Sequence, residues 1–135
     1  MINQLHVQTS GPGLYEFTGQ VASIVNDAGI EEGLCNLLVQ HTSASLVIQE
    51  NADPSARRDL EQWLSRLVPE HDPLYTHIQE GADDMPAHIK SALTATTLSI
   101  PVSEGRLALG VWQGLYLWEH RLRGARRHIV MHLGT

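Results

Sequence analysis

The stretch HTSASLVIQENADP, residues 41–54, decides how we divide the chain into elements. In an extended segment His41 and Ser43 share one face, because successive side chains of a strand alternate. Asp53 before Pro54 is typical of a helix start, since the carboxylate caps the helix and proline needs no donor there. The stretch therefore predicts a strand, a polar corner and a helix. The corner could form a functional site or serve only as a turn with a cap.

The composition is typical of one ordered domain. With 135 residues and 42% hydrophobic content, the chain is long enough for a single core and too short for two ordinary domains. The net charge is −6 and only residues 121–127 are strongly basic, so we expect no nucleic-acid binding. No signal peptide or membrane span is visible, which favours a cytoplasmic location without membrane association. The single cysteine, Cys35, lies in an apolar run and predicts an inert core thiol.

Hydrophobic periodicity predicts an α+β fold for a single domain over residues 1–135. Alternating or continuous apolar runs indicate about seven strands, the first at 5–9 and the last at 127–133. Helical spacing indicates two to three helices: one that follows Thr18 and stops at Gly29, one that Pro54 opens and Pro69 ends, and one that carries Met85 to Leu93. Because the joints between strands are short, we expect a mostly antiparallel sheet with the helices packed on one side.

Further expectations concern the three predicted helices and one loop. Thr18 should cap the first helix and Gly29 should end it. The second helix has an apolar stripe that we assign to the core rather than to a partner groove: Leu60, Trp63, Leu64 and Leu67. On the third helix the expected inward face is Met85, Ile89, Ala92 and Leu93. Residues 70–80, which include His77, should form a polar loop that could cover a site.

Asp84 and His88 are the first candidates for chemistry. Four residues apart, they lie on one face of the predicted helix and could share a ligand. A structural alternative exists for each, because Asp84 also favours the positive end of the helix dipole and single histidines often lie on surfaces. His128 and His132 flank Val130 on the last strand, where they could bridge a metal or only face solvent.

Glu119 is the second candidate. On the strand 115–121 it follows Leu115 and Leu117 on the face that we expect to be internal. A buried carboxylate needs a partner. That partner could be Arg121, a metal ion or a protonated histidine.

Together the polar candidates suit a divalent ion or metal-free acid–base chemistry. They are His41, Glu50, Asn51, Asp84, His88 and Glu119. Two histidines with carboxylates fit zinc, manganese or nickel. The sequence has no zinc-protease helix, phosphate-binding glycine loop or serine elbow.

Several blocks in the same order resemble the YjbQ-like family, whose members are described as secondary thiamine-phosphate synthases. The blocks are HTSASL at 41–46, ENADP at 50–54, DDMPAHIKSAL at 83–93, WQG at 112–114 and EHR at 119–121. The chain has Val111 where the family usually has threonine before the tryptophan. The resemblance implies a compact α+β domain that assembles as a homotrimer. It also implies coupling of a pyrimidine diphosphate to a thiazole phosphate with release of pyrophosphate.

The resemblance, with the polar candidates above, gives an expected site. We expect catalytic roles for His41, Asp84, His88 and Glu119 and metal ligation by His41, His88 and Glu119. We expect Asn51, Gln113 and Arg121 to bind a small phosphorylated substrate. A divalent metal, namely zinc, manganese or magnesium, would neutralise the leaving diphosphate. Two other functions stay open: a metal- or ligand-binding trimeric module without turnover, and a metal-dependent hydrolase.

Overall fold

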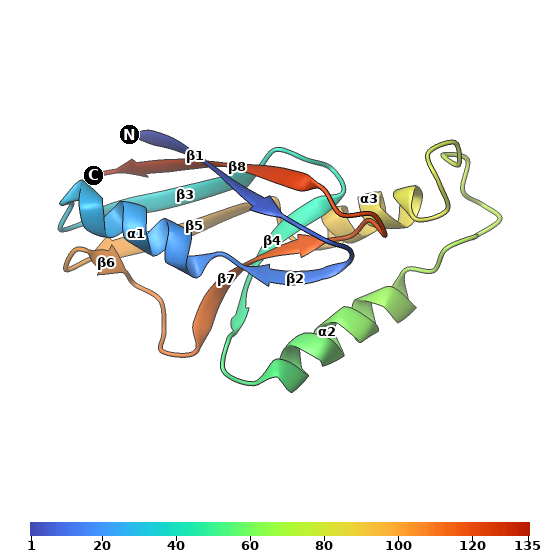
Figure 1. Cartoon of the computed structure of the whole chain (residues 1–135), viewed down its shortest axis with the longest axis horizontal. Helices are drawn as coiled ribbons and strands as arrows, with labels where there is room; N and C mark the ends of the chain where they lie inside the picture. Colours follow the sequence, from blue (N-terminus) through green and yellow to red (C-terminus); the bar gives the residue numbers. More distant parts are fainter.

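Eight antiparallel strands and three helices make up the computed structural model, which describes residues 1–135 (Figure 1). In chain order they are β1 (Ile2–Gln8), β2 (Gly13–Glu16), α1 (Thr18–Ala28), β3 (Gly33–Val39), β4 (Ala44–Glu50), α2 (Pro54–Leu67), α3 (Asp84–Leu93), β5 (Thr97–Ser103), β6 (Arg106–Leu107), β7 (Gln113–Glu119) and β8 (Arg126–Gly134). The predicted α+β class is confirmed.

The strands divide into two sheets. One has five strands in the order β1-β8-β3-β5-β6, and the other has three in the order β2-β7-β4. Every strand pair is antiparallel, as the short joints predicted. The division into two sheets was not predicted, because alternation reports which face of a strand is buried and not which strand lies beside it.

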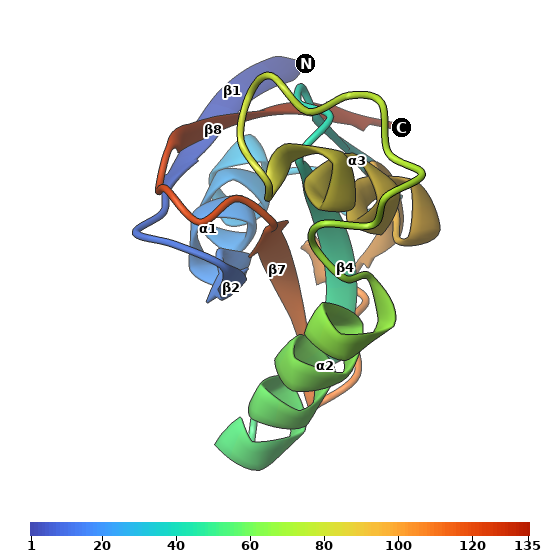
Figure 2. The same ribbon diagram turned by 90° about the vertical axis from the view of Figure 1, so that its right-hand side faces the viewer.

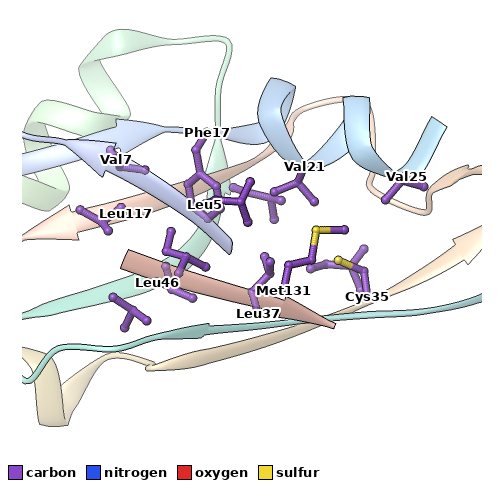
Figure 3. Close-up of a cluster of buried hydrophobic side chains, with 14 of the residues drawn as sticks. Leu5, Val7, Phe17, Val21, Val25, Cys35, Leu37, Leu46, Leu117 and Met131 are labelled. Carbon is purple, nitrogen blue, oxygen red and sulfur yellow. The ribbon is translucent and has the colours of Figure 1, made fainter. Parts of the chain in front are cut away.

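The main core lies between the five-stranded sheet and a layer made of α1, β4 and β7 (Figure 3). Leu5, Val21, Leu117 and Met131 meet there from both sheets and from α1. Cys35 is fully buried among them, as predicted, and burial raises the pKa of its thiol to about 11. None of the three helices is both long and apolar enough to cross a bilayer.

The start of α1 differs from the expectation for Thr18. The helix begins at Thr18 and receives no side-chain cap. Thr18 Oγ1 instead donates to Glu16 Oε2 and accepts the backbone N–H of Leu115, each at 2.8 Å. The hydroxyl therefore ties α1 to β7. Gly29 ends the helix with a φ of 70°, as predicted, because glycine adopts the left-handed region without a steric cost.

Helix α2 is capped as predicted but is less buried than its stripe suggested. Asp53 Oδ1 accepts the N–H of Ser55 at 2.9 Å ahead of Pro54. Of the stripe, only Leu64 is buried, while Trp63 is 52% exposed and Leu67 51% exposed. Figure 2 shows that α2 projects away from the sheets. It contacts them through Leu60 and Leu64, which pack with Leu14, Tyr116 and Trp118. The small sheet covers only the side of the helix that carries Leu60 and Leu64, and no other element covers Trp63 and Leu67.

The inward face of α3 also differs from the prediction. Its buried residues are Asp84, Pro86, Ala87 and Ser91, whereas Leu93 is 58% exposed. Ser91 Oγ donates to the carbonyl of Ala44 in β4 at 2.9 Å. Small and hydrogen-bonding residues thus bring α3 close to the edge of β4. Ile89 packs against the core cluster under α2, as predicted, whereas Ala92 and Leu93 are exposed. This packing buries Asp84 at the head of the helix.

Strand β7 is buried on both faces, where we expected one. Leu115 and Leu117 enter the main core, while Tyr116 and Trp118 pack under α2 with Leu64. The polar residues at the end of β7 are therefore enclosed. Glu119 is fully buried and His120 is 3% exposed.

Candidate functional site

Three metal-ligating side chains meet at the head of α3: His77, Asp84 and His88. His77 Nε2 lies 2.6 Å and His88 Nε2 lies 3.2 Å from the same oxygen, Asp84 Oδ2. The two imidazole rings meet edge to face with their centroids 5.3 Å apart. Asp84 is buried, whereas the histidine side chains are 47% and 32% exposed. The buried Asp84 therefore fixes one side of the cluster to the protein, and the side formed by the two histidines is open to solvent.

The hydrogen bond of His88 to Thr42 decides what its other nitrogen can do. His88 Nδ1 lies 3.0 Å from the carbonyl oxygen of Thr42, so Nδ1 carries the proton and donates. In a neutral ring Nε2 is then an acceptor. It faces the carboxylate oxygen Asp84 Oδ2, which is also an acceptor. Two acceptors at 3.2 Å need a positive species between them, either a proton on Nε2 or a metal ion.

Arg121 holds the carboxylates of the site in place. Its Nη1 donates to Asp84 Oδ1 at 2.6 Å and its Nε donates to Asp83 Oδ2 at 2.9 Å, while Nη2 reaches the carbonyl of Glu80. Burial of Asp84 opposes its ionisation, but the hydrogen bond from His77 and the charge of Arg121 hold the pKa of Asp84 below its ordinary value. Asp84 is therefore a carboxylate with one oxygen fixed and the other presented to the histidines.

The ligand set fits zinc or manganese. Two imidazoles and a carboxylate are usual ligands of either ion, whereas magnesium prefers oxygen ligands. Ligands about 2 Å from a tetrahedral ion lie about 3.3 Å from one another. The His88–Asp84 distance of 3.2 Å already suits this geometry, and His77 on its loop would move outward by a fraction of an ångström. Three protein ligands leave a coordination position free.

His41 lies beside the cluster but outside the three-residue group. It lines a shallow pocket of about 210 Å³ together with Thr42 and His88. Its Nε2 accepts the backbone N–H of His128 at 3.2 Å. Burial and the charge of Arg127 lower the pKa of His41, so the ring is neutral at pH 7. The structure thus brings His41, Asp84, His88 and Arg121 to one region.

Glu119 has a different partner from those the sequence suggested. Its Oε1 accepts from Arg127 Nε at 2.8 Å and from Thr9 Oγ1 at 2.6 Å, and its Oε2 accepts from Arg127 and from the backbone N–H groups of His120 and Arg121. The guanidinium of Arg121 points to the aspartates instead. Burial opposes ionisation of Glu119, but the bonds from Arg127 and Thr9 hold its pKa below the ordinary value. Both oxygens are occupied by protein donors.

Asn51 and Gln113 lie at the other end of the small sheet. Residue 44 of β4 pairs with Glu119 and residue 50 pairs with Gln113, so six steps, or about 20 Å, separate the two ends. Asn51 Nδ2 donates to Glu16 Oε2 at 3.3 Å, and Gln113 Oε1 accepts the N–H of Gly110 at 2.7 Å. Within one chain these two residues are not part of the metal-ligating cluster.

Sequence reasoning missed His77 as a cluster residue. The predicted loop is present, since residues 68–83 contain no helix or strand, and it carries His77 back onto α3. His77 had only one weak signal, a histidine in a polar loop close before Asp84. Asp83 was missed as well, although the pair Asp83 and Asp84 occurs within the family block and binds one arginine.

The fold and the site together define a class: an α+β domain of two antiparallel sheets with a His–Asp–His cluster at the head of a helix. The family model described as UPF0047 protein YjbQ-like matches residues 3–135, and the chain belongs to this family. The resemblance noted from the sequence blocks is confirmed.

Relatives and solved structures agree with this membership. UPF0047 protein sll1880 of Synechocystis is 50% identical over 96% of this chain and 88% of its own length. UPF0047 protein YjbQ of Escherichia coli O157:H7 is 43% identical over 93% and 91%. The crystal structure of conserved hypothetical protein TT1486 from Thermus thermophilus has a TM-score of 0.87 at 36% identity, covering 98% of this chain and 99% of that one. None of these names states an activity.

Proposed function

We propose that this chain is a divalent-metal-dependent enzyme that acts on a small phosphorylated substrate. His77, Asp84 and His88 would hold the metal. The observation that carries the proposal is that one ligand atom each of His77, Asp84 and His88 lie within 4.8 Å of one another. The Thr42 hydrogen bond leaves Nε2 of a neutral His88 ring as an acceptor that can bind a metal ion. The open side of the cluster favours catalysis over a structural ion, because structural zinc sites are closed by four protein ligands.

The protein groups around the cluster have separate tasks. When bound, the metal would neutralise charge that develops on a leaving phosphate or diphosphate. Thr42 keeps His88 in the tautomer that presents Nε2, and Arg121 fixes the orientation of Asp84. His41 lines the same shallow pocket as His88 and is neutral; because its Nε2 is an acceptor, its Nδ1 carries the proton and can donate it to a substrate group and take it back.

The family resemblance supports a specific reaction, namely thiamine-phosphate synthesis. In it the pyrimidine loses pyrophosphate and the thiazole nitrogen forms the new bond to the pyrimidine methylene carbon. The purified protein, incubated with both substrates and Zn²⁺ or Mn²⁺, should release pyrophosphate and thiamine phosphate in equal amounts. A hydrolase would release phosphate or pyrophosphate from one substrate without the second. A binding module would saturate with substrate and release nothing.

Metal content tests the cluster directly. The native protein should carry about one divalent ion per chain, and His77→Ala, Asp84→Asn and His88→Ala should each lose it while remaining folded by circular dichroism. His71→Ala is the matched control, because His71 lies exposed in the same loop and outside the cluster. A His88→Ala variant that keeps its metal, or full activity in that variant, would remove His88 from the site.

We also propose a homotrimer, which the family resemblance suggested. Two observations support it. Asn51 and Gln113 match family blocks but lie at the end of the small sheet opposite Ala44 and Glu119, about 20 Å along it, so a neighbouring chain would be needed to complete one site from both groups. In the loop beside Gln113, Val111 is 82% exposed and Trp112 is 64% exposed. Large apolar side chains that are exposed together are typical of interfaces.

A further inference from the structure

A second pocket has Asp83 in its lining. It is a cavity of about 210 Å³ enclosed by the turn before β2, by α2 and α3, and by the end of β7. Its walls combine the aromatic and apolar side chains of Trp118, Leu64 and Pro86 with the polar side chains of Lys90 and His120. Asp83 lines the cavity and shares Arg121 with Asp84 of the metal-ligating cluster.

Lys90 is the unusual residue of this cavity. It is the only lysine among the nine basic residues of the chain, and it is half-buried. Each of the other half-buried or buried cations at the site has a carboxylate partner: Arg121 has Asp83 and Asp84, and Arg127 has Glu119. The Lys90 ammonium has no hydrogen-bond or ion-pair partner in the protein. A partly desolvated charge of this kind is stabilised by an anionic partner.

No carboxylate around the cavity forms an ion pair with Lys90, although the charges of Glu70 and Asp83 favour its ammonium form. Glu119, which also lines the cavity, is paired with Arg127. Asp83 is held by Arg121 and by the backbone N–H of Leu122. Glu61 accepts the N–H of Leu14 at 2.8 Å through Oε2, and Glu70 lies exposed at the rim. Because these carboxylates limit the negative charge that the cavity accepts, a ligand with one anionic group fits better than a polyanion.

We infer that this cavity binds a small ligand with one anionic group at Lys90 and a flat ring against Trp118. The volume suits a single ring, since a cavity of about 150 Å³ accepts benzene. His120 donates or accepts at the cavity wall as a neutral imidazole, with Nε2 held by Ser45 Oγ at 2.8 Å. The anionic group could be a carboxylate or a phosphate, and the same ammonium binds both. Naming this ligand as the substrate rests on the proposed function; the binding itself does not.

Phenyl phosphate and benzoate are the probes, because each joins one ring to one of the two anionic groups. Titrated calorimetrically into the full chain, at least one should bind with a Kd of about 1 mM or tighter. Lys90→Met should weaken that binding about tenfold or more, and Lys90→Arg should retain most of it. Arg106→Met, which removes an exposed cation, is the matched control and should change the Kd by less than about twofold.

The single lysine gives a second readout. Acetylation by N-hydroxysuccinimidyl acetate modifies Lys90 and the chain's amino terminus only, so mass spectrometry of the peptide around Lys90 reports this one side chain. The probe that binds should slow acetylation at Lys90 and leave the amino terminus unaffected. Binding of neither probe, or equal binding by wild type and Lys90→Met, would overturn the inference.

Metal analysis of the same variant separates this inference from the proposed function. Lys90→Met should keep the metal content of the wild type, because Lys90 is not one of the three cluster residues. Loss of the probe with retained metal supports a separate subsite. Loss of both together would place Lys90 in the metal site and overturn the subsite. A metal-free protein that still binds the probe through Lys90 would refute the metal enzyme and leave the subsite standing.

Discussion

Among single residues, Glu119 is the one whose side chain accepts the most hydrogen bonds. Five donors from three parts of the chain meet its two oxygens, and they include the guanidinium of Arg127 on β8. The carboxylate therefore joins the end of β7 to β8 and, through Thr9, to the segment after β1. We therefore expect a substitution of Glu119 to affect the stability of the fold more than it affects metal binding.

Glu119→Gln should lower the free energy of unfolding by about 3–5 kcal/mol, because it leaves the buried guanidinium of Arg127 without its counter-ion. Urea unfolding followed by circular dichroism measures the change. Glu104→Gln is the control: its ion pair with Arg106 is exposed, and its loss should cost less than about 1 kcal/mol.

The double variant Glu119→Gln/Arg127→Met keeps this prediction testable if the single variant does not fold. Removing both charges should recover part of the lost stability, because an uncompensated buried charge costs more than an apolar replacement of the pair. A folded Glu119→Gln protein of unchanged stability that has lost its metal would instead return Glu119 to the ligand set.

His120 should make the stability of the folded protein depend on pH. Burial, with Lys90 nearby, lowers the pKa of His120 from 6.5 to about 3 in the folded chain. Between these values the unfolded chain binds a proton that the folded chain does not, so stability falls as the pH falls from 6.5 toward 3. The slope for one proton is about 1.4 kcal/mol per pH unit.

Urea unfolding between about pH 6.5 and 5 tests this slope, above the range in which the carboxylates titrate. His120→Asn should be less stable at pH 7 because its bond to Ser45 is lost or weakened, and its stability should fall less steeply with acid. Equal slopes in wild type and variant would show that His120 is not held neutral by the fold.

At the scale of elements, the loop between β7 and β8 has little space for a larger residue. A Cβ on Gly124 would overlap the carbonyl oxygen of Thr9, whose hydroxyl also accepts the N–H of Ala125. Gly124→Ala should therefore destabilise the fold by about 1–3 kcal/mol, as overpacking does. Thermal unfolding measures the loss.

Gly19→Ala in the first turn of α1 is the matched control. A Cβ there meets nothing within 4 Å, and alanine favours a helix over glycine, so this variant should be as stable as wild type or slightly more stable. A Gly124→Ala protein that unfolds together with the control would show that the loop shifts freely to accept a methyl group.

The elements also show which parts of the site the sequence could predict. Asp84 and His88 share a helix face because four residues make about one turn, and the structure places them together. His77 lies on a loop, and the course of a loop cannot be predicted from hydrophobic periodicity. The partner of Glu119 comes from a strand that pairs elsewhere, so its identity depended on the two-sheet arrangement. Local pattern predicted the elements, and long-range packing decided the contacts between them.

At the scale of the whole molecule, the predicted α+β class held because alternation and short joints report strand type directly. The predicted buried stripe of α2 and inward face of α3 were only partly right: Leu60, Leu64 and Ile89 pack in the core, but Trp63, Leu67 and Leu93 do not. An amphipathic helix shows which side is apolar but not whether a neighbour covers it. Trp63 and Leu67 stay half exposed in the single chain. These exposed apolar residues agree with the proposed assembly.

The homotrimer predicts a specific mass in solution. Light scattering with size-exclusion chromatography should give three times the chain mass of 14.9 kDa. Because the trimer would bury apolar surface, dilution should lower the thermal midpoint. A species of one chain mass at every concentration tested would refute the trimer, and the metal-ligating cluster, built from one chain, would be unaffected.

Because Cys35 is buried, the rate at which its thiol reacts reports how often the large sheet opens. Cys35 carries the only thiol of the chain, and its strand pairs with β5 on one side and β8 on the other. A disulfide reagent such as dithionitrobenzoate reaches the sulfur only after these strands separate. Under excess reagent, the colour of the released thiolate therefore develops at the rate at which the centre of the large sheet opens, without any label being introduced.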